Sequence, residues 1–459
     1  MMIPHNVLSQ IKSIVGDKHL MVSGHKMVEF GADATKLSAV PDAVAFPGSA
    51  EEISEILTLA TSNRFPVVVR GAGSGMSGGA IPVQGGLVLA MDRFNNIPSI
   101  DEENMVAHVE SGVITADLKE AARSKGLFYP PDPASIKIST IGGNLAECAG
   151  GLRAVKYGVT RDYVLGMEVV LPTGEILSTG VETMKGVAGY DLTRLIVGSE
   201  GTLAVIVSAT VRLVPLPEVI QTMLAFFPGL PTAVSTVTEI MKKGIVPSVL
   251  ELVDSLCISL VRDEVDLEIP EAAGAMLLIE LDGNAESVKY YAGQVRQICA
   301  EQGCLDFATA SSPTEAESLW EARRNISPSL YKLRPHKVSE DVVVPRTRMV
   351  EMVRFLSELS REYGVPIPVF GHAGDGNLHV NIMLDKNDPR EMRKVDRIVT
   401  RLFEKVLELG GTITGEHGVG ITKRRYLPME IPPAGLALMR RIKKAFDPAG
   451  ILNPNKILP

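Results

Sequence analysis

The sequence predicts an α+β protein with more than one domain, and three observations lead to this class. At 459 residues, the chain is longer than one ordinary domain. Short apolar runs typical of strands alternate with longer segments whose apolar residues recur at helical spacing. The segment Pro215-Leu-Pro217 carries two prolines in three residues, which marks a boundary. We expect a first domain at 1–217, a second at 218–435, and a segment at 436–459 that returns to the first.

Composition and charge exclude several classes of protein. Hydrophobic residues make up 45% and charged residues 22%, a composition with ample core. The net charge is -8 at pH 7 without any basic run, so we expect no nucleic-acid partner. The start of the chain has no signal-peptide pattern, and no apolar run reaches the roughly 20 residues of a transmembrane segment. The 4 cysteines lack Cys-x-x-Cys spacing, which argues against disulfides or an iron–sulfur cluster and favours the cytoplasm.

The first domain is expected to hold a glycine-rich loop between two strands. Ser49-Ala-Glu-Glu52 has the pattern of a capping box and predicts a helix, and Pro66–Val69 predicts a strand. The following loop, Arg70–Gly79, contains the dinucleotide fingerprint G-x-G-x-x-G. We reject a Rossmann site, because Pro82 and a glycine pair leave no room for the helix that the fingerprint requires. The loop is instead expected to bind an anion such as a pyrophosphate through its backbone N–H groups.

Further glycine-rich sections indicate a large, elongated cofactor. One section runs from Pro130 through Ser139–Asn144 to Gly151, and another joins Gly189–Thr193 to Val197–Ile206. Glycines allow the backbone to approach a planar ligand closely. Three separated loops of this kind predict one extended ligand.

Residues 218–410 alternate strand and helix. The expected strands are Leu224–Phe227, Val249–Leu252, Met276–Leu281, Leu305–Ala310 and Val342–Val344. The expected helices are Thr232–Lys243, Ser287–Glu301, Thr314–Ile326, Thr347–Tyr363 and Pro389–Leu409.

Two histidine-containing clusters predict a metal site. His372 and His379 flank a turn, and the alternation after Leu378 predicts a strand with His379 and Asn381 on one face. Glu416 and His417 form the second cluster. Two histidines and a glutamate make a plausible three-ligand divalent-metal site with an open position, and His417 would remain free as a base. The alternative is that these are hydrogen-bonded loop residues without a metal.

At this point the chain resembles a known family, the FAD-linked oxidases of the vanillyl-alcohol-oxidase superfamily. Within it, the chain is similar to the branch of the glycolate oxidase flavin subunit, D-lactate dehydrogenase and D-2-hydroxyglutarate dehydrogenase. The residues that carry the resemblance are Arg70–Gly79, Tyr129–Pro133, Thr140–Asn144, Gly158–Leu165, Val197–Thr202, Gly371–Asn381, Glu416–Gly420 and Asp447–Lys456.

The resemblance implies a two-part FAD-binding domain and an α+β cap domain with an antiparallel sheet. The Arg70–Gly79 loop has no histidine, so the FAD is expected to be non-covalent. Cys148 departs from the asparagine expected in such sequences. The residues expected to contact FAD are Arg70, Gly71, Ala72, Gly73, Ser74, Gly75, Gly78, Pro131, Asp132, Thr140, Gly143, Asn144, Gly198, Glu200, Gly201, Ile206 and Asn453.

The resemblance also implies roles around the substrate. His372, His379 and Glu416 would hold the divalent metal (Zn, Fe or Mn), and His417 would be the general base. Arg323 is the choice for the substrate carboxylate, because guanidinium pairs with carboxylates in a bidentate manner, with Arg324 as the alternative. Lys337 and Asn381 are secondary candidates. Asp375 is expected to orient a histidine or to stabilise the turn.

The expected function is metal-assisted, FAD-dependent oxidation of a small D-2-hydroxy acid, D-lactate or glycolate. D-2-hydroxyglutarate is the alternative substrate. Two other classes stay open: an aryl-alcohol-oxidase type without metal, and a non-catalytic flavoprotein that relays electrons. The expected electron acceptor is an iron–sulfur subunit, an electron-transferring flavoprotein or a quinone, and a partner could attach the protein to the inner membrane.

Overall fold

The structure is a computed structural model that describes residues 3–459. The chain divides into two compact units. The first contains the residues up to Gly150, Val159–Leu216 and Glu416–Pro459, and the second contains Gly151–Gly158 and Pro217–Gly415. These units differ from the expected ranges in two stretches: 151–158 joins the second unit, and 416–435 joins the first.

Hydrogen bonds explain both differences. In the second unit, Arg153 donates to Glu280 Oε2 over 3.0 Å, and Tyr157 Oη donates to Asp282 Oδ2 over 2.7 Å. In the first unit, Glu200 Oε1 and Oε2 accept from the N–H groups of Val419 and Gly420, each over 2.7 Å. Each stretch is therefore bound to its unit by buried carboxylates that lie far from it in the sequence.

The first unit contains two main sheets. The order of the four-stranded sheet is β1-β2-β4-β3, in which β2, β4 and β3 run parallel. The order of the five-stranded antiparallel sheet is β5-β6-β10-β8-β9, and β7 and β11 form a small pair. The strands are β1 Leu20–Met21, β2 Ala43–Ala45, β3 Val67–Arg70, β4 Leu87–Ala90, β5 Ser99–Asp101, β6 Val106–Glu110, β7 Leu127–Phe128, β8 Val164–Val170, β9 Ile176–Gly180, β10 Val205–Arg212 and β11 Val214–Pro215.

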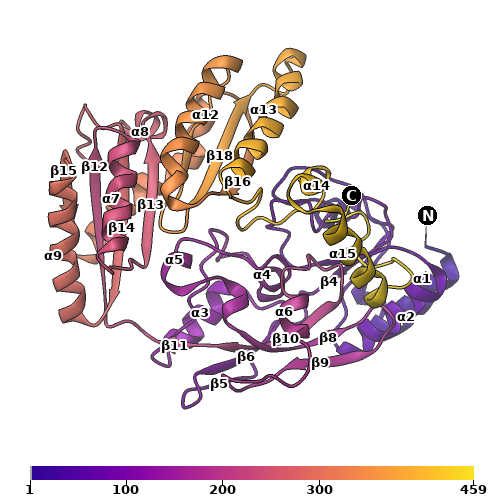
Figure 1. The fold of residues 1–459 in the computed structure, drawn as a ribbon. Helices are drawn as coiled ribbons and strands as arrows, with labels where there is room; N and C mark the ends of the chain where they lie inside the picture. The colour runs from indigo at the N-terminus through magenta and orange to yellow at the C-terminus, as the bar shows by residue number, and fades with distance from the viewer. Residues whose placement is uncertain (1–2) are drawn as a thin grey trace. The chain divides into compact units, whose positions relative to one another are not determined.

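Helices α1 and α2 lie side by side in this unit and share its core with the four-stranded sheet (Figure 1). Ser49 Oγ accepts from the N–H of Glu52 and caps α2, as the capping pattern predicts. Glu52 Oε2 accepts from the N–H of Gly48 rather than Ser49, so the reciprocal half of the box is shifted by one residue. The helices are α1 His5–Val15, α2 Ala50–Asn63, α3 Thr115–Arg123, α4 Ile141–Glu147, α6 Leu192–Ile196, α14 Leu427–Glu430 and α15 Pro433–Phe446.

Between β3 and β4 the described chain forms turns and bends without a helix, which confirms the rejection of a Rossmann unit. The C-terminal segment reaches β3 instead. Val67 donates its N–H to Ile451 over 2.8 Å and accepts from the N–H of Asn453 over 2.7 Å. The segment after α15 thus continues the sheet edge beside the glycine-rich loop.

The second unit is built on one antiparallel sheet of seven strands, in the order β15-β12-β14-β13-β17-β18-β16. The strands are β12 Val219–Phe227, β13 Val249–Asp254, β14 Ala275–Gly283, β15 Asp306–Thr309, β16 His336–Val343, β17 Val369–His372 and β18 Asn377–Leu384. The helices are α5 Ala154–Tyr157, α7 Leu230–Lys242, α8 Ser255–Val261, α9 Ala285–Glu301, α10 Pro313–Arg324, α11 Ile326–Ser329, α12 Met349–Tyr363 and α13 Pro389–Glu408.

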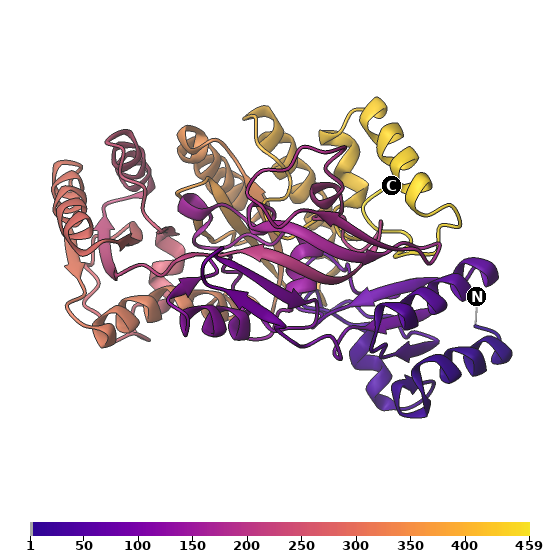
Figure 2. The ribbon, with the colours of Figure 1, turned by 90° about the horizontal axis from the view of Figure 1, so that it is seen from below.

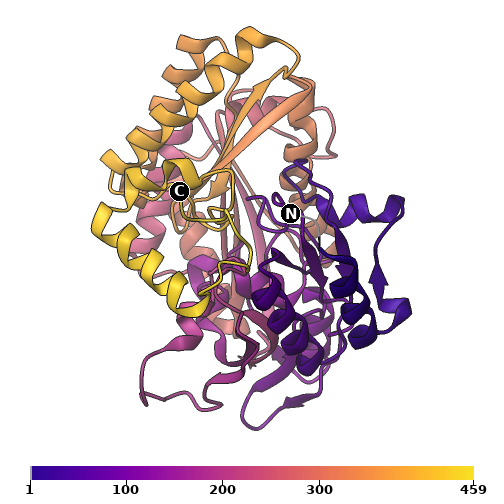
Figure 3. The same cartoon turned by 90° about the vertical axis from the view of Figure 1, so that its right-hand side faces the viewer.

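Helices cover the two faces of this sheet unequally. Helices α9, α7, α12 and α13 form a row along one face (Figure 2), and α12 packs beside α13 (Figure 3). Helices α8, α10 and α11 pack on the other face, where Phe226, Leu278, Val253 and Met383 join their core. Because side chains alternate along a strand, Glu251, His372 and His379 belong to this second face. Within the described residues, no helix combines the length and apolar character needed to cross a membrane.

The Asp447 carboxylate should hold the C-terminal segment in place. It is buried, and it accepts from the N–H groups of Ile451 and Leu452 over 3.1 and 2.9 Å and from Lys443 Nζ over 2.5 Å. Replacing Asp447 by Ala leaves these donors unpaired, so we expect the free energy of unfolding to fall by about 2–4 kcal/mol in urea titrations. Asp191→Ala, which removes an exposed helix cap, should cost about 1 kcal/mol. Equal losses in the two variants would contradict this role.

Candidate functional site

A cavity of about 220 Å³ lies in the first unit, and the glycine-rich loops line it. Residues expected to bind FAD that line it are Gly71, Ala72, Gly73, Ser74, Gly75, Thr140, Gly143, Asn144, Glu200, Gly201, Ile206 and Asn453. Small residues dominate this set, so the backbone itself forms much of the wall. Their contact with FAD stays a prediction.

The other expected FAD residues, Arg70, Gly78, Pro131, Asp132 and Gly198, are absent from the lining. The charged members of this group have protein partners instead. Arg70 donates to the carbonyls of Ala32 and Glu29 over 2.6 and 3.0 Å. Asp132 pairs with Lys119 Nζ over 2.6 Å. These contacts brace the loops from outside the cavity.

Two further expectations from the glycine-rich sections are corrected in part. Gly189–Thr193 does not line the cavity, and Tyr190 is 96% exposed. Thr140–Asn144 is not an extended loop but the start of α4, where Thr140 Oγ1 accepts from the N–H of Gly143. The glycine pattern could not distinguish a loop from the first turn of a short helix.

Cys148 occupies a position with a physical preference for asparagine. Its φ is 54°, in the left-handed region, and it ends α4. Asparagine adopts this conformation more readily than most residues, which accounts for the expectation. In this chain, the Cys148 Sγ accepts from Arg161 Nε over 3.1 Å, so the polar contact is made by sulfur.

The cavity offers unpaired polar atoms to a ligand. Three of its lining residues carry buried polar atoms that have no hydrogen-bond partner: Ser111 Oγ, Glu147 Oε2 and Asn453 Oδ1. A buried polar atom without a partner costs about 1–3 kcal/mol, so such atoms are rare unless a ligand satisfies them. The donor and acceptor groups of FAD fit this lining.

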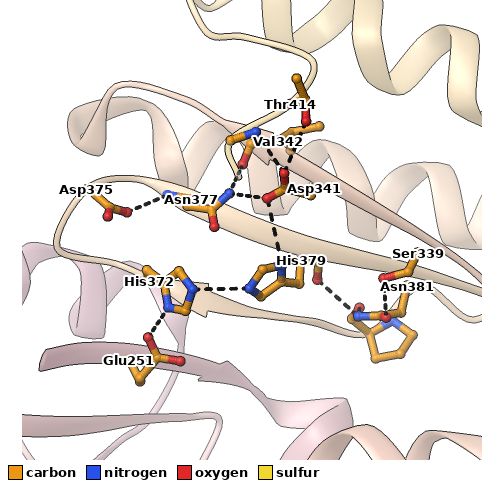
Figure 4. Close-up of polar contacts among 12 residues, drawn as sticks. Glu251, Ser339, Asp341, Val342, His372, Asp375, Asn377, His379, Asn381 and Thr414 are labelled. Carbon is orange, nitrogen blue, oxygen red and sulfur yellow. Dashed lines mark hydrogen bonds and ion pairs between the residues drawn. The ribbon is translucent and has the colours of Figure 1, made fainter. Parts of the chain in front are cut away.

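In the second unit, the β17–β18 hairpin brings the two histidines together (Figure 4), and His379 and Asn381 share one face of β18, as the alternation predicts. His372 is the last residue of β17, and His379 lies on β18. Their Nε2 atoms face each other at 3.3 Å, and the two rings are nearly perpendicular at 89°. Both residues are buried.

Two buried carboxylates lie beside the outer nitrogens of these rings. Glu251 Oε1 contacts His372 Nδ1, and Asp341 Oδ1 lies 3.9 Å from His379 Nδ1, beyond hydrogen-bond distance (Figure 4). The hydrogen bond with Glu251 fixes the orientation of the His372 ring and leaves its Nε2 for another partner. Arg323 also binds Glu251 Oε2, through Nε at 2.8 Å and Nη2 at 2.7 Å.

The surroundings of Glu251 favour its ionised form. Burial alone would raise the pKa of this carboxyl, but the charges of His372 and Arg323 outweigh burial and lower its pKa to about 2. Glu251 therefore remains an anion throughout the neutral range. It can accept hydrogen bonds from both partners.

Asp341 connects the hairpin to the segment before Glu416. Its Oδ1 accepts from Asn377 Nδ2 over 2.6 Å, and its Oδ2 accepts from the N–H of Gly415 over 2.8 Å and from Thr414 Oγ1 over 3.3 Å. Asp341 has no exposed side-chain surface. Glu416 follows Gly415 directly in the chain, so this carboxylate fixes the residue before a predicted ligand.

The remaining predicted residues have distinct surroundings. Glu416 and His417 belong to the first unit and line its cavity. Arg324 pairs with the exposed Glu317 over 2.5 Å, whereas Arg323 lies on the histidine face. Lys337 Nζ contacts Ser327 Oγ over 3.1 Å.

Two polar residues of the hairpin region support the backbone. Asn381 Nδ2 donates to the carbonyl of His379 over 3.1 Å, and its Oδ1 accepts from Ser339 over 3.1 Å. Asp375 Oδ1 accepts from the N–H of Asn377 over 3.2 Å, the turn-stabilising alternative left open for this residue.

Sequence reasoning missed Glu251, Asp341 and Glu147. The first two lie in the strands at 249–254 and 336–343, each of which contains a second acid, Asp254 or Glu340, and the strand pattern carries no signal of which acid makes which contact. Glu147 lies within the second glycine-rich section, between Asn144 and Gly151, and that position could have marked it.

Family models match both halves of the chain. The model for the FAD binding domain matches residues 41–180, and the model for FAD linked oxidases, C-terminal domain, matches residues 216–457. The chain is 46% identical to the glycolate oxidase subunit GlcD of Bacillus subtilis (strain 168), over 99% of this chain and 97% of that protein. It is 35% identical to a D-lactate dehydrogenase of Anaerostipes hadrus, over 96% of this chain and 95% of that protein.

Solved structures share the fold. A p-cresol methylhydroxylase with substrate bound superposes with a TM-score of 0.82 at 18% identity, covering 98% of this chain and 96% of that one. A 4-ethylphenol oxidase from Gulosibacter chungangensis superposes with a TM-score of 0.77 at 20% identity, covering 99% and 97%. At this identity the likeness concerns the fold alone.

Loss of the Asp341 carboxylate should destabilise the hairpin site. Asp341→Ala leaves the donors of Asn377, Thr414 and Gly415 without their acceptor, and we expect the free energy of unfolding to fall by about 3 kcal/mol in urea titrations. The control Asp388→Ala removes the cap of α13 and should cost about 1 kcal/mol. A loss no larger than that of the control would show that Asp341 does not anchor this region.

Proposed function

The chain belongs to the FAD-linked oxidases, and from this premise we propose that it oxidises a small D-2-hydroxy acid, D-lactate or glycolate, with the help of a divalent metal. It is an FAD-dependent oxidoreductase of the glycolate oxidase and D-lactate dehydrogenase type. The relatives' names support the substrate class. Oxidation of a 2-hydroxy acid to the 2-oxo acid removes a proton from the hydroxyl and a hydride from C2.

The distance between the two facing imidazole nitrogens is the main support for a bound metal. Two nitrogens that ligate one ion at about 2.0–2.1 Å lie about 3 Å apart in tetrahedral geometry, which matches the 3.3 Å between the Nε2 atoms of His372 and His379. Glu251 on the outer nitrogen of His372 is the orienting carboxylate usual behind a histidine ligand. We propose Glu416 as the third ligand. Histidines and a carboxylate suit Zn, Fe or Mn.

FAD and the metal supply the two parts of the chemistry. When bound, FAD accepts the hydride that leaves C2. When bound, the metal lowers the pKa of the substrate hydroxyl, so that deprotonation becomes feasible near neutral pH. We propose that the glycine-rich residues that line the cavity, together with Asn453, hold FAD.

The protein's own side chains then bind the acid and move its proton. We propose that His417 takes the hydroxyl proton on an imidazole nitrogen. Arg323 and Lys337 would bind the substrate carboxylate. Guanidinium has five N–H donors and Glu251 engages only Nε and Nη2, so Arg323 keeps donors for a second carboxylate. Asn381 would support the His379 backbone.

We propose that the electrons leave to another protein or a quinone. Among the described residues, the only group of potential metal ligands contains no cysteine, which supports an acceptor outside this chain. The name of the relatives, glycolate oxidase subunit, points to a partner subunit. An iron–sulfur subunit or an electron-transferring flavoprotein fits this need.

An anaerobic titration tests the proposal. D-lactate or glycolate should bleach the visible flavin absorbance of the purified protein, chelator treatment should abolish the bleaching, and Zn, Fe or Mn should restore it. L-lactate serves as the control acid and should leave the flavin oxidised. Bleaching that survives removal of the metal would favour the metal-free oxidase class. A flavin that no 2-hydroxy acid reduces, with metal present, would favour an electron-relay role.

The role of His417 has its own test. His417→Gln should lower kcat by about 10²–10⁴-fold, the usual contribution of a general base, while FAD content stays at the wild-type level. His336→Gln changes a half-exposed histidine on β16 and should leave kcat unchanged. A His417→Gln protein with wild-type kcat would assign the base to another residue.

A further inference from the structure

Glu147 is a cavity residue whose carboxyl group has no partner. It is the last residue of α4 and lines the cavity of the first unit. Its Oε2 atom is buried without a hydrogen bond. Ser77 lies nearby, but the Ser77 Oγ is itself buried and unpartnered, so the geometry gives no bond between them.

Two glycines make room for this carboxyl. A Cβ added to Gly79 would come within 2.9 Å of Glu147 Oε1, and one added to Gly418 would collide with Glu147 Oε2. Gly79 belongs to the glycine-rich loop and Gly418 follows His417. The carboxyl group is therefore packed between two separate loops. An exposed acid would not need glycine at both of these positions.

The surroundings of Glu147 disfavour a negative charge. Burial raises the pKa of Glu147 well above its usual range, and the nearby Glu200 and Asp33 raise it further. Lys456 acts in the opposite direction, but its Nζ donates to the carbonyls of Gly78 and Ile81 over 2.5 and 2.6 Å. An uncharged carboxylic acid has an O–H that can donate a hydrogen bond.

We infer that Glu147 is a cofactor-binding residue that, as an uncharged acid, donates a hydrogen bond to an acceptor atom of FAD. The diphosphate, the ring carbonyls and the unprotonated ring nitrogens of FAD are acceptors, and the diphosphate would repel a carboxylate. Binding would satisfy a polar group that the protein leaves unpaired. This inference rests on the proposed function only in taking the cavity as the FAD site.

The test compares FAD affinity and apo-protein stability in the same variants. Flavin fluorescence titrations of the apo-protein should give a dissociation constant about tenfold higher for Glu147→Ala, because one hydrogen bond of about 1.4 kcal/mol is lost. Glu147→Gln keeps an uncharged donor and should stay within about threefold of wild type. Glu120→Ala, on the exposed side of α3, is the matched control and should bind like wild type.

Apo-protein stability separates ligand binding from a structural role. Because Glu147 is unpaired without FAD, the thermal midpoint of apo Glu147→Ala should equal or exceed that of the wild-type apo-protein. A lower midpoint, or a variant that fails to fold, would assign Glu147 a structural role and overturn the inference.

The FAD affinities of the variants can also contradict the inference about Glu147. Wild-type affinity in Glu147→Ala, or a loss in Glu147→Gln as large as in Glu147→Ala, would overturn this inference while leaving the proposed function intact. A wild-type chain that binds no FAD would overturn both together. Substrate oxidation is not part of this test, so its absence affects only the proposed function.

Discussion

Two fully buried carboxylates, Glu251 and Asp341, are the constraint on which the second unit's site depends. Neither side chain has exposed surface, and a buried charge without partners costs far more than a hydrogen bond returns. Each therefore needs several donors, and those donors are the residues that shape the site. Glu251 requires His372 and Arg323, and Asp341 requires Asn377, Thr414 and Gly415. The orientation of His372 follows from its hydrogen bond to Glu251.

In the first unit, the cavity is formed mainly by backbone and small residues rather than by buried charged side chains. Glycine, alanine and serine make up more than half of its lining, and the left-handed φ of Gly73, 69°, admits no Cβ without strain. Backbone N–H groups can then approach a ligand directly. Glu200 ties the Val419–Gly420 stretch to this cavity, so the loop that carries His417 is fixed by its own buried acid.

Strands and helices with a clear apolar periodicity could be predicted from the sequence. The long-range contacts of their polar residues could not. The strand at Leu378 and the helix after Ser49 follow from local rules and are present in the fold, and the chain between β3 and β4 contains no helix, as the proline and glycines there predict. The His372–His379 pair was also visible, because a turn between two short strands brings their ends together. Glu251 lies 121 residues before His372 in the chain, and only the sheet register unites them. Long-range pairing of this kind leaves no trace in composition or spacing.

The two units contain buried polar groups of two kinds, and the difference between them is informative. Glu251 and Asp341 are fully paired by the protein, which is how a chain holds a site rigid before any ligand arrives. Glu147, Ser111 and Asn453 each keep a buried atom without a partner, at a cost in stability that folding alone does not recover. These three atoms line one cavity, which supports a ligand as their missing partner. The satisfied acids therefore belong to the rigid frame, and we propose that the unsatisfied atoms are positions where the cofactor binds.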